Sequence, residues 1–119
     1  MKIVNQELTY YTMDVFTNTP FGGNPLAVFT DAAELSDQQM QKIAAELNLS
    51  ETVFIREQTG PQRWSIRIFM PKREIPFAGH PTVGTALLIK ALGWLDEEGD
   101  AASLVLDEVA GPVPVVFSK

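Results

Sequence analysis

The stretch from Ile75 to Leu92 constrains the fold of this chain more than any other. Its sequence, IPFAGHPTVGTALLIKAL, predicts a tight turn followed by a helix that begins at about Pro81 and is closed by Gly93. Proline suits a first helical position because its φ is preset and its missing N–H is not needed there. Apolar residues cover nearly the whole circumference of this helix, and Lys90 is its only charge. Such a helix is typically buried, and this one is too short to span a membrane, so we expect sheet around it.

The start of this helix is a candidate binding site. The first N–H groups of a helix lack partners within it and carry partial positive charge. A helix start that opens into a cleft therefore binds a carboxylate or a phosphate readily. Gly79 and His80 stand at this position, and His80 is the only histidine in the chain. The alternative is a core helix whose start is capped by its own loop, and the residues alone leave both interpretations open.

The remaining periodicities predict an α+β fold with one further helix and about six strands. Ser36 and Gln39 have the spacing of a capping box. An apolar stripe follows at helical spacing and Asn48 ends it, which is typical of a surface helix. Runs of β-branched and aromatic residues predict the strands, and turn-forming or acidic clusters separate several of them. The predicted strands cover residues 9–16, 26–29, 50–56, 64–70, 103–106 and 113–117, with turns or loops at 18–25, 59–62, 96–100 and 111–114.

Composition excludes several classes of function. The 119 residues suffice for one domain, and a net charge of −6 argues against nucleic acid as a partner. No apolar run has the length of a signal peptide or a membrane span, so we expect no membrane partner. The chain has no cysteine and one histidine, and it lacks glycine-rich nucleotide-binding motifs. We therefore expect no metal and no cofactor, and a cytoplasmic location.

Glu51 is the strongest candidate for acid–base chemistry. It stands at the start of a predicted strand beside the apolar residues Val53 and Phe54. A carboxyl group against apolar walls is suited to exchanging protons in catalysis. The alternative is an exposed glutamate at a strand end, which is common in any protein. Asp14 and Asn24 are further candidates with a similar structural alternative, because such residues often hydrogen-bond the local backbone in turns and at strand ends.

Three segments together resemble the phenazine-biosynthesis isomerase (PhzF-like) family. They are FGGNPLAVF at 21–29, NLSETVF at 48–54 and RIFMPKREIPFAGHPTVGTA at 67–86. The resemblance implies a diaminopimelate-epimerase-like fold, in which each of two halves wraps a curved, barrel-like mixed sheet around a central helix. It also implies cofactor-independent proton transfer in the cleft between the halves. The implied catalytic residues are Glu51 and His80, and the substrate-binding residues that we assign with them are Asn24, Ser50, Gly79, Pro81 and Thr82.

The resemblance also sets expectations about substrate and assembly. Family members of known activity isomerise trans-2,3-dihydro-3-hydroxyanthranilate, a small carboxylate-bearing molecule. Their chains are about twice as long as this one, which resembles the N-terminal half, taken here as one unit over residues 1–119. The other half normally carries an acidic residue and a Gly-Ser-Ala turn, and nothing in this sequence matches them. We therefore expect either a homodimer or a separate C-terminal half.

The sequence bears on two other functional classes. Racemases and epimerases of this fold use a pair of thiols, one on each side of the substrate carbon, so a chain without cysteine cannot work that way by itself. The alternative to an isomerase is a non-catalytic binding or assembly module, or an inactive fragment, that keeps the fold.

Overall fold

A computed structural model describes residues 8–15, 24–95 and 103–117 of the chain. Within these residues, seven strands form one mixed sheet and two helices pack on it. The strands are β1 (Tyr10–Val15), β2 (Asn24–Phe29), β3 (Glu51–Gly60), β4 (Arg63–Phe69), β5 (Glu74–Ile75), β6 (Ser103–Glu108) and β7 (Gly111–Val116), and the helices are α1 (Asp37–Leu47) and α2 (Gly79–Ala91).

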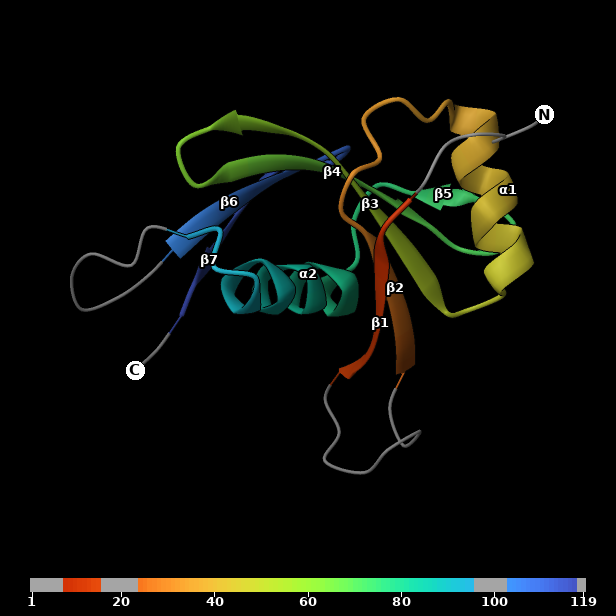
Figure 1. Cartoon of the computed structure of the whole chain (residues 1–119), viewed down its shortest axis with the longest axis horizontal. Helices are drawn as coiled ribbons and strands as arrows, with labels where there is room; N and C mark the ends of the chain where they lie inside the picture. Colours follow the sequence, from red (N-terminus) through yellow and green to blue (C-terminus); the bar gives the residue numbers. More distant parts are fainter. Residues whose placement is uncertain (1–7, 16–23, 96–102, 118–119) are drawn as a thin grey trace.

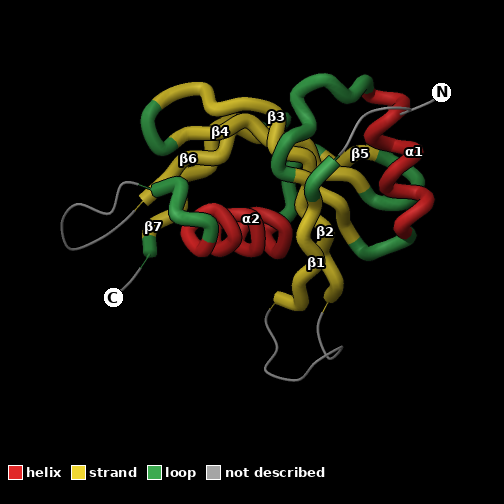
Figure 2. Tube along the Cα trace, in the orientation of Figure 1, coloured by secondary structure: helices red, strands yellow, loops and turns green. Residues whose placement is uncertain are grey.

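The sheet has the order β1-β2-β3-β4-β6-β7, with β5 pairing beside β4. The pairs β2–β3 and β4–β6 are parallel, and the other pairs are antiparallel. Parallel neighbours need a crossover connection, and α1 and α2 lie in the two crossovers. Figure 1 shows the sheet bending over α2, with α1 outside the bend, and Figure 2 shows the same layering by secondary structure.

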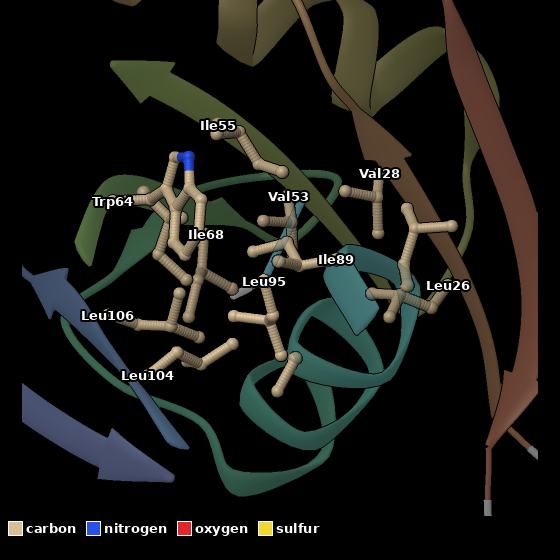
Figure 3. Packing of buried hydrophobic residues seen from close by; sticks show 13 residues of the cluster. Leu26, Val28, Val53, Ile55, Trp64, Ile68, Ile89, Leu95, Leu104 and Leu106 are labelled. Carbon is tan, nitrogen blue, oxygen red and sulfur yellow. The ribbon is translucent and has the colours of Figure 1, made fainter. Parts of the chain in front are cut away.

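The larger hydrophobic core lies between the bent sheet and α2. Strand alternation turns every second residue of β2, β3, β4 and β6 toward the helix. Ile89 of α2 is fully buried and lies among these side chains, as Figure 3 shows. The sheet residues of this core are Leu26, Val28, Val53, Ile55, Trp64, Ile66, Ile68, Leu104 and Leu106.

The second core lies on the opposite face of the sheet, under α1. Phe54 of β3 stacks on Phe29, with ring centroids 5.1 Å apart, and meets the edge of Phe69 at 5.5 Å. Met40 and Ala44, from the predicted apolar stripe of α1, are fully buried against this cluster. The stripe therefore has the role that its spacing predicted.

The predicted caps of α1 are confirmed. The Ser36 hydroxyl accepts a hydrogen bond from the Gln39 backbone N–H at 3.1 Å. The Gln39 side chain accepts one from the Ser36 backbone N–H at 2.8 Å, which completes the capping box. Asn48 follows the helix with a φ of 52°, a left-handed conformation that asparagine tolerates and that stops the helix.

Several predicted boundaries were wrong. Strand β3 continues to Gly60, and the hairpin turn is formed by Pro61 and Gln62, whose φ is 55°. The predicted strand 64–70 includes Met70, but β4 ends at Phe69, and Met70 is 37% exposed. Strand β5 was not predicted because two residues carry no periodicity. The predicted turn residues 18–23 and the acidic loop 96–100 lie outside the described residues.

The buried helix differs from the prediction in two ways. It begins at Gly79, after Ala78 in extended conformation, so Pro81 is the third helical residue. Proline is tolerated there because the first N–H groups of a helix have no partner within it. The helix is also not buried on every side, since Leu87 is 46% exposed. Within the described residues the sheet does not close, and β1 and β7 are its edges.

Candidate active site

Glu51 and His80 meet at one end of the sheet. Glu51 is the first residue of β3, and strand alternation turns it to the same face as Val53, toward α2. His80 is the second residue of α2. The His80 Nδ1 and a Glu51 carboxylate oxygen lie 3.0 Å apart. The two side chains are 11% and 15% exposed, so the pair is largely withdrawn from water but not sealed.

The start of α2 beside this pair is open. No side chain of the described residues caps the helix, which starts after Ala78. Gly79 is exposed, and a β-carbon built at Gly79 would meet no atom within 4 Å. The first N–H groups of α2 thus have no side-chain cap among the described residues, and Gly79 beside them is exposed, as an anion-binding helix start requires. This observation favours the binding interpretation over a helix start capped by its loop.

The structure places the other predicted binding residues differently. Pro81 and Thr82 are buried in the first turns of α2, and the Thr82 hydroxyl is engaged inside the protein. Ser50 lies immediately before Glu51 and is partly exposed. Asn24 opens β2, next to the strand that carries Glu51, and its side chain lies outside the described part of the structure. The structure thus brings Glu51 and His80 into contact, with Gly79 next to His80 in the chain, and the catalytic and binding roles of all these residues stay predictions.

One buried acid was missed by the sequence reasoning. Glu108 ends β6, is only 7% exposed, and has an oxygen 2.6 Å from the Thr82 hydroxyl oxygen. Burial raises the pKa of the Glu108 carboxyl, and the hydrogen bond with Thr82 opposes this in part. The signal was available, because Leu104, Leu106 and Glu108 alternate along one face. The predicted strand ended at residue 106 and so left Glu108 out.

Two features are absent from the described residues. No three histidine, aspartate or glutamate side chains converge there as a metal-binding group. Neither helix in the same part of the chain combines the length and the hydropathy of a membrane-spanning segment.

Comparison with known proteins identifies the class to which this fold and site belong. The family model of phenazine biosynthesis-like proteins, PhzC-PhzF, matches residues 13–119. The chain therefore belongs to the PhzF-like family, as its motifs indicated. The same match covers the strand that carries Glu51 and the helix that carries His80.

Individual relatives sharpen this assignment. The chain is 48% identical to an uncharacterized isomerase of Mesorhizobium japonicum over 96% of its own length and 37% of the relative. It is 43% identical to the trans-2,3-dihydro-3-hydroxyanthranilate isomerase of Pseudomonas aeruginosa, covering 92% of this chain and 37% of that enzyme. The solved structure of a predicted epimerase from Pseudomonas aeruginosa superimposes with a TM-score of 0.82 and 35% identity, covering 95% of this chain and 39% of that one. The chain thus spans well under half the length of these relatives.

Proposed function

We propose that this chain provides one half of the active site of a cofactor-independent isomerase. The observation that carries the proposal is the Glu51–His80 pair, with 3.0 Å between Nδ1 and the carboxylate, beside the uncapped start of α2. A base within hydrogen-bond reach of a polar group, next to an anion-binding helix start, fits a small substrate that bears a carboxylate. The relative that is named for trans-2,3-dihydro-3-hydroxyanthranilate isomerisation supports a substrate of that type.

The proposed reaction moves one proton between two carbon atoms. The Glu51 carboxylate removes a proton from a substrate carbon, and the electron pair of the broken C–H bond shifts into the adjacent double-bond system. Glu51 then returns the proton to a second carbon of that system, so the net composition and oxidation state of the substrate do not change. His80 orients the Glu51 carboxyl, and the N–H groups at the start of α2 hold the substrate carboxylate.

An exchange experiment tests this function directly. The 119-residue chain is incubated in D₂O with trans-2,3-dihydro-3-hydroxyanthranilate, and NMR follows the loss of substrate and the entry of deuterium at carbon. We expect both, because a proton held by Glu51 exchanges with solvent between the two steps. A chain that binds the substrate without any exchange at carbon would contradict an active self-paired site and would leave the non-catalytic module or a separate second half.

We further propose that the site is completed by a second half, in a diaminopimelate-epimerase-like arrangement. In that arrangement each half wraps its sheet around a central helix, as α2 and the bent sheet suggest for this chain. A second wall over Glu51 and His80 would exclude water, which strengthens the electrostatic interactions within a site. The cytoplasmic location expected from the composition and motifs of the sequence stays a prediction.

We expect a second copy of this chain to provide the other half of the site. Apolar side chains are exposed along α2: Phe77 before it is 48% exposed, Leu87 on it is 46% exposed, and Trp94 after it is 39% exposed. Closed two-fold pairing is the commonest way for one chain to cover such a surface. Light scattering at micromolar concentration should give the mass of a dimer, and Leu87→Glu should lower it. A clean monomer in both cases would contradict the homodimer and favour a separate C-terminal half.

A further inference from the structure

The carboxyl group of Glu108 contacts the first turns of α2 at Thr82, and the proposed reaction does not use this contact. Its oxygen Oε2 is 2.6 Å from the Thr82 hydroxyl oxygen, and that same hydroxyl oxygen is 2.7 Å from the carbonyl oxygen of Ala78. Thr82 is 4% exposed and Glu108 is 7% exposed, so water has little access to this contact. Three oxygen atoms thus share two short, buried contacts.

Counting protons decides how these contacts are made. A threonine hydroxyl has one proton to donate, and a backbone carbonyl can only accept. Threonine hydroxyls in helices commonly donate to the carbonyl one turn back, which is Ala78 for Thr82. If that proton goes to Ala78, then the 2.6 Å contact with Glu108 needs a proton from the carboxyl group. The reverse choice would leave two lone-pair oxygens facing each other at 2.7 Å.

The second oxygen of Glu108 agrees with a neutral carboxyl group. Oε1 is buried and accepts no hydrogen bond from the described residues. An ionised carboxylate with such an oxygen loses the hydration of a full charge, whereas the carbonyl oxygen of a neutral acid loses much less. Burial correspondingly raises the pKa of the Glu108 carboxyl above its ordinary 4.5.

No cation among the described residues offsets a negative charge on Glu108. Only burial and the Thr82 hydroxyl act on its pKa, and β7, its hairpin partner, has no titratable side chain. The ionisable groups of the other neighbouring elements make contacts elsewhere: His80 with Glu51, Lys90 over the Phe117 ring, Arg67 with Glu74, and Arg63 with Asp107.

We propose that Glu108 is a positioning residue for the start of α2, and that its carboxyl O–H donates to the Thr82 hydroxyl, which donates in turn to the Ala78 carbonyl. Ala78 precedes the two residues, Gly79 and His80, that present the uncapped helix start to the site. The backbone N–H of Ala110 also donates to the Pro76 carbonyl at 3.1 Å, so the β6–β7 hairpin contacts the same segment twice. A single proton on Glu108 thereby connects the hairpin to the helix start.

The inference builds on the proposed role of the helix start, but its test does not involve turnover. NMR follows the carboxyl carbon of Glu108 in the unmodified chain as pH rises from 3 to 9, together with the amide signals of Gly79 and His80. We expect the carboxyl carbon to titrate above 4.5 and the two amide signals to shift along the same curve. Titration at or below 4.5 would overturn the proposal, whatever the isomerase assay shows.

Variants separate positioning from mere packing. Thr82→Ser keeps the hydroxyl and should keep the amide shifts coupled to Glu108, whereas Thr82→Val removes the hydroxyl and should abolish the coupling. Equal coupling in both variants would show that the Thr82 hydroxyl does not transmit it and would overturn the proposed chain of hydrogen bonds. Valine also removes a polar group from a buried position, so Thr82→Val alone could alter the packing. Thr82→Ser is therefore the necessary comparison, because it keeps the hydroxyl.

A stability profile gives the sign of the effect. A carboxyl whose pKa is raised on folding stabilises the protein fully below its unfolded pKa, here about 4.5, and this contribution is lost as pH rises toward the folded value. Glu108→Gln keeps a donor to Thr82 without a charge. Between the unfolded and the folded pKa of Glu108, the ratio of the folding constant of Glu108→Gln to that of the unmodified chain should therefore rise by up to about tenfold per pH unit.

The neighbouring residue provides a matched control. Asp107 bears the same functional group but faces the other way, where the hydrogen bond from Arg63 at 2.6 Å lowers its pKa. Asp107→Asn should therefore show no gain in stability with rising pH. A Glu108→Gln variant that follows the unmodified chain at every pH, or that behaves like Asp107→Asn, would overturn the proposal.

Discussion

Replacing Glu51 with glutamine is expected to abolish proton transfer while leaving the fold intact. Glutamine has nearly the shape of glutamate, and its side chain can still hydrogen-bond His80 across the 3.0 Å contact. It cannot accept and return a proton, and general acid–base groups typically contribute about 10²–10⁴-fold to rate. We therefore expect deuterium incorporation at the substrate carbon to fall by at least about a hundredfold.

The control for this substitution is Glu57→Gln on the same strand. Glu57 is exposed on β3, so its substitution should leave both exchange and urea unfolding unchanged. The two variants differ in the position of one carboxylate and in nothing else. A Glu51→Gln variant with an unchanged exchange rate would remove Glu51 from the mechanism, and the pair with His80 would then be structural.

Among the substitutions proposed for this protein, Phe54→Ala is expected to lower the free energy of unfolding the most. Phe54 is fully buried at the centre of the core under α1, where it contacts the rings of Phe29 and Phe69. Truncating a buried phenylalanine costs about 3–5 kcal/mol, because apolar burial is lost and a cavity remains. Proteins of this kind are stable by about 5–15 kcal/mol, so the loss is a large fraction of the total.

Urea unfolding followed by circular dichroism measures this effect. Val116→Ala is the comparison, since Val116 is 70% exposed at the end of β7 and its truncation should change stability by less than about 0.5 kcal/mol. Equal midpoints for the two variants would mean that the core under α1 does not support the fold as its packing indicates.

The sequence correctly predicted those elements that are determined by residues close together in the chain. The capping box of Ser36 and Gln39 set the start of α1, and alternation placed Val53 and Ile55 on the inner face. The predicted ends of helices and strands were wrong where contacts between distant residues outweigh the local sequence pattern. Strand β5 exists because it pairs with β4 and because Arg67 forms an ion pair with Glu74, and neither cause is visible in two residues of sequence.

The candidate site was predicted in a different way. Glu51 and His80 are 29 residues apart, and no periodicity brings them together. The residues alone nominated Glu51 and His80 separately, and only the resemblance to a family assigned both of them to catalysis. The exposure of Leu87 was missed because an apolar helix was assumed to be covered on all sides, whereas the sheet stays open in the described residues. How strands pair across long distances in sequence cannot be deduced from one chain.

The open edge of the sheet at β7 limits how molecules of this protein can stack. The N–H of Val105 in β6 donates toward β4, so by alternation the N–H groups of Leu104 and Leu106 point toward β7. The register then turns positions 112 and 114 of β7 outward, and both are prolines, which have no N–H to donate. An incoming strand would find acceptors there without matching donors. The prolines thus disfavour the addition of a further strand at β7, which is one of the two open edges of the sheet.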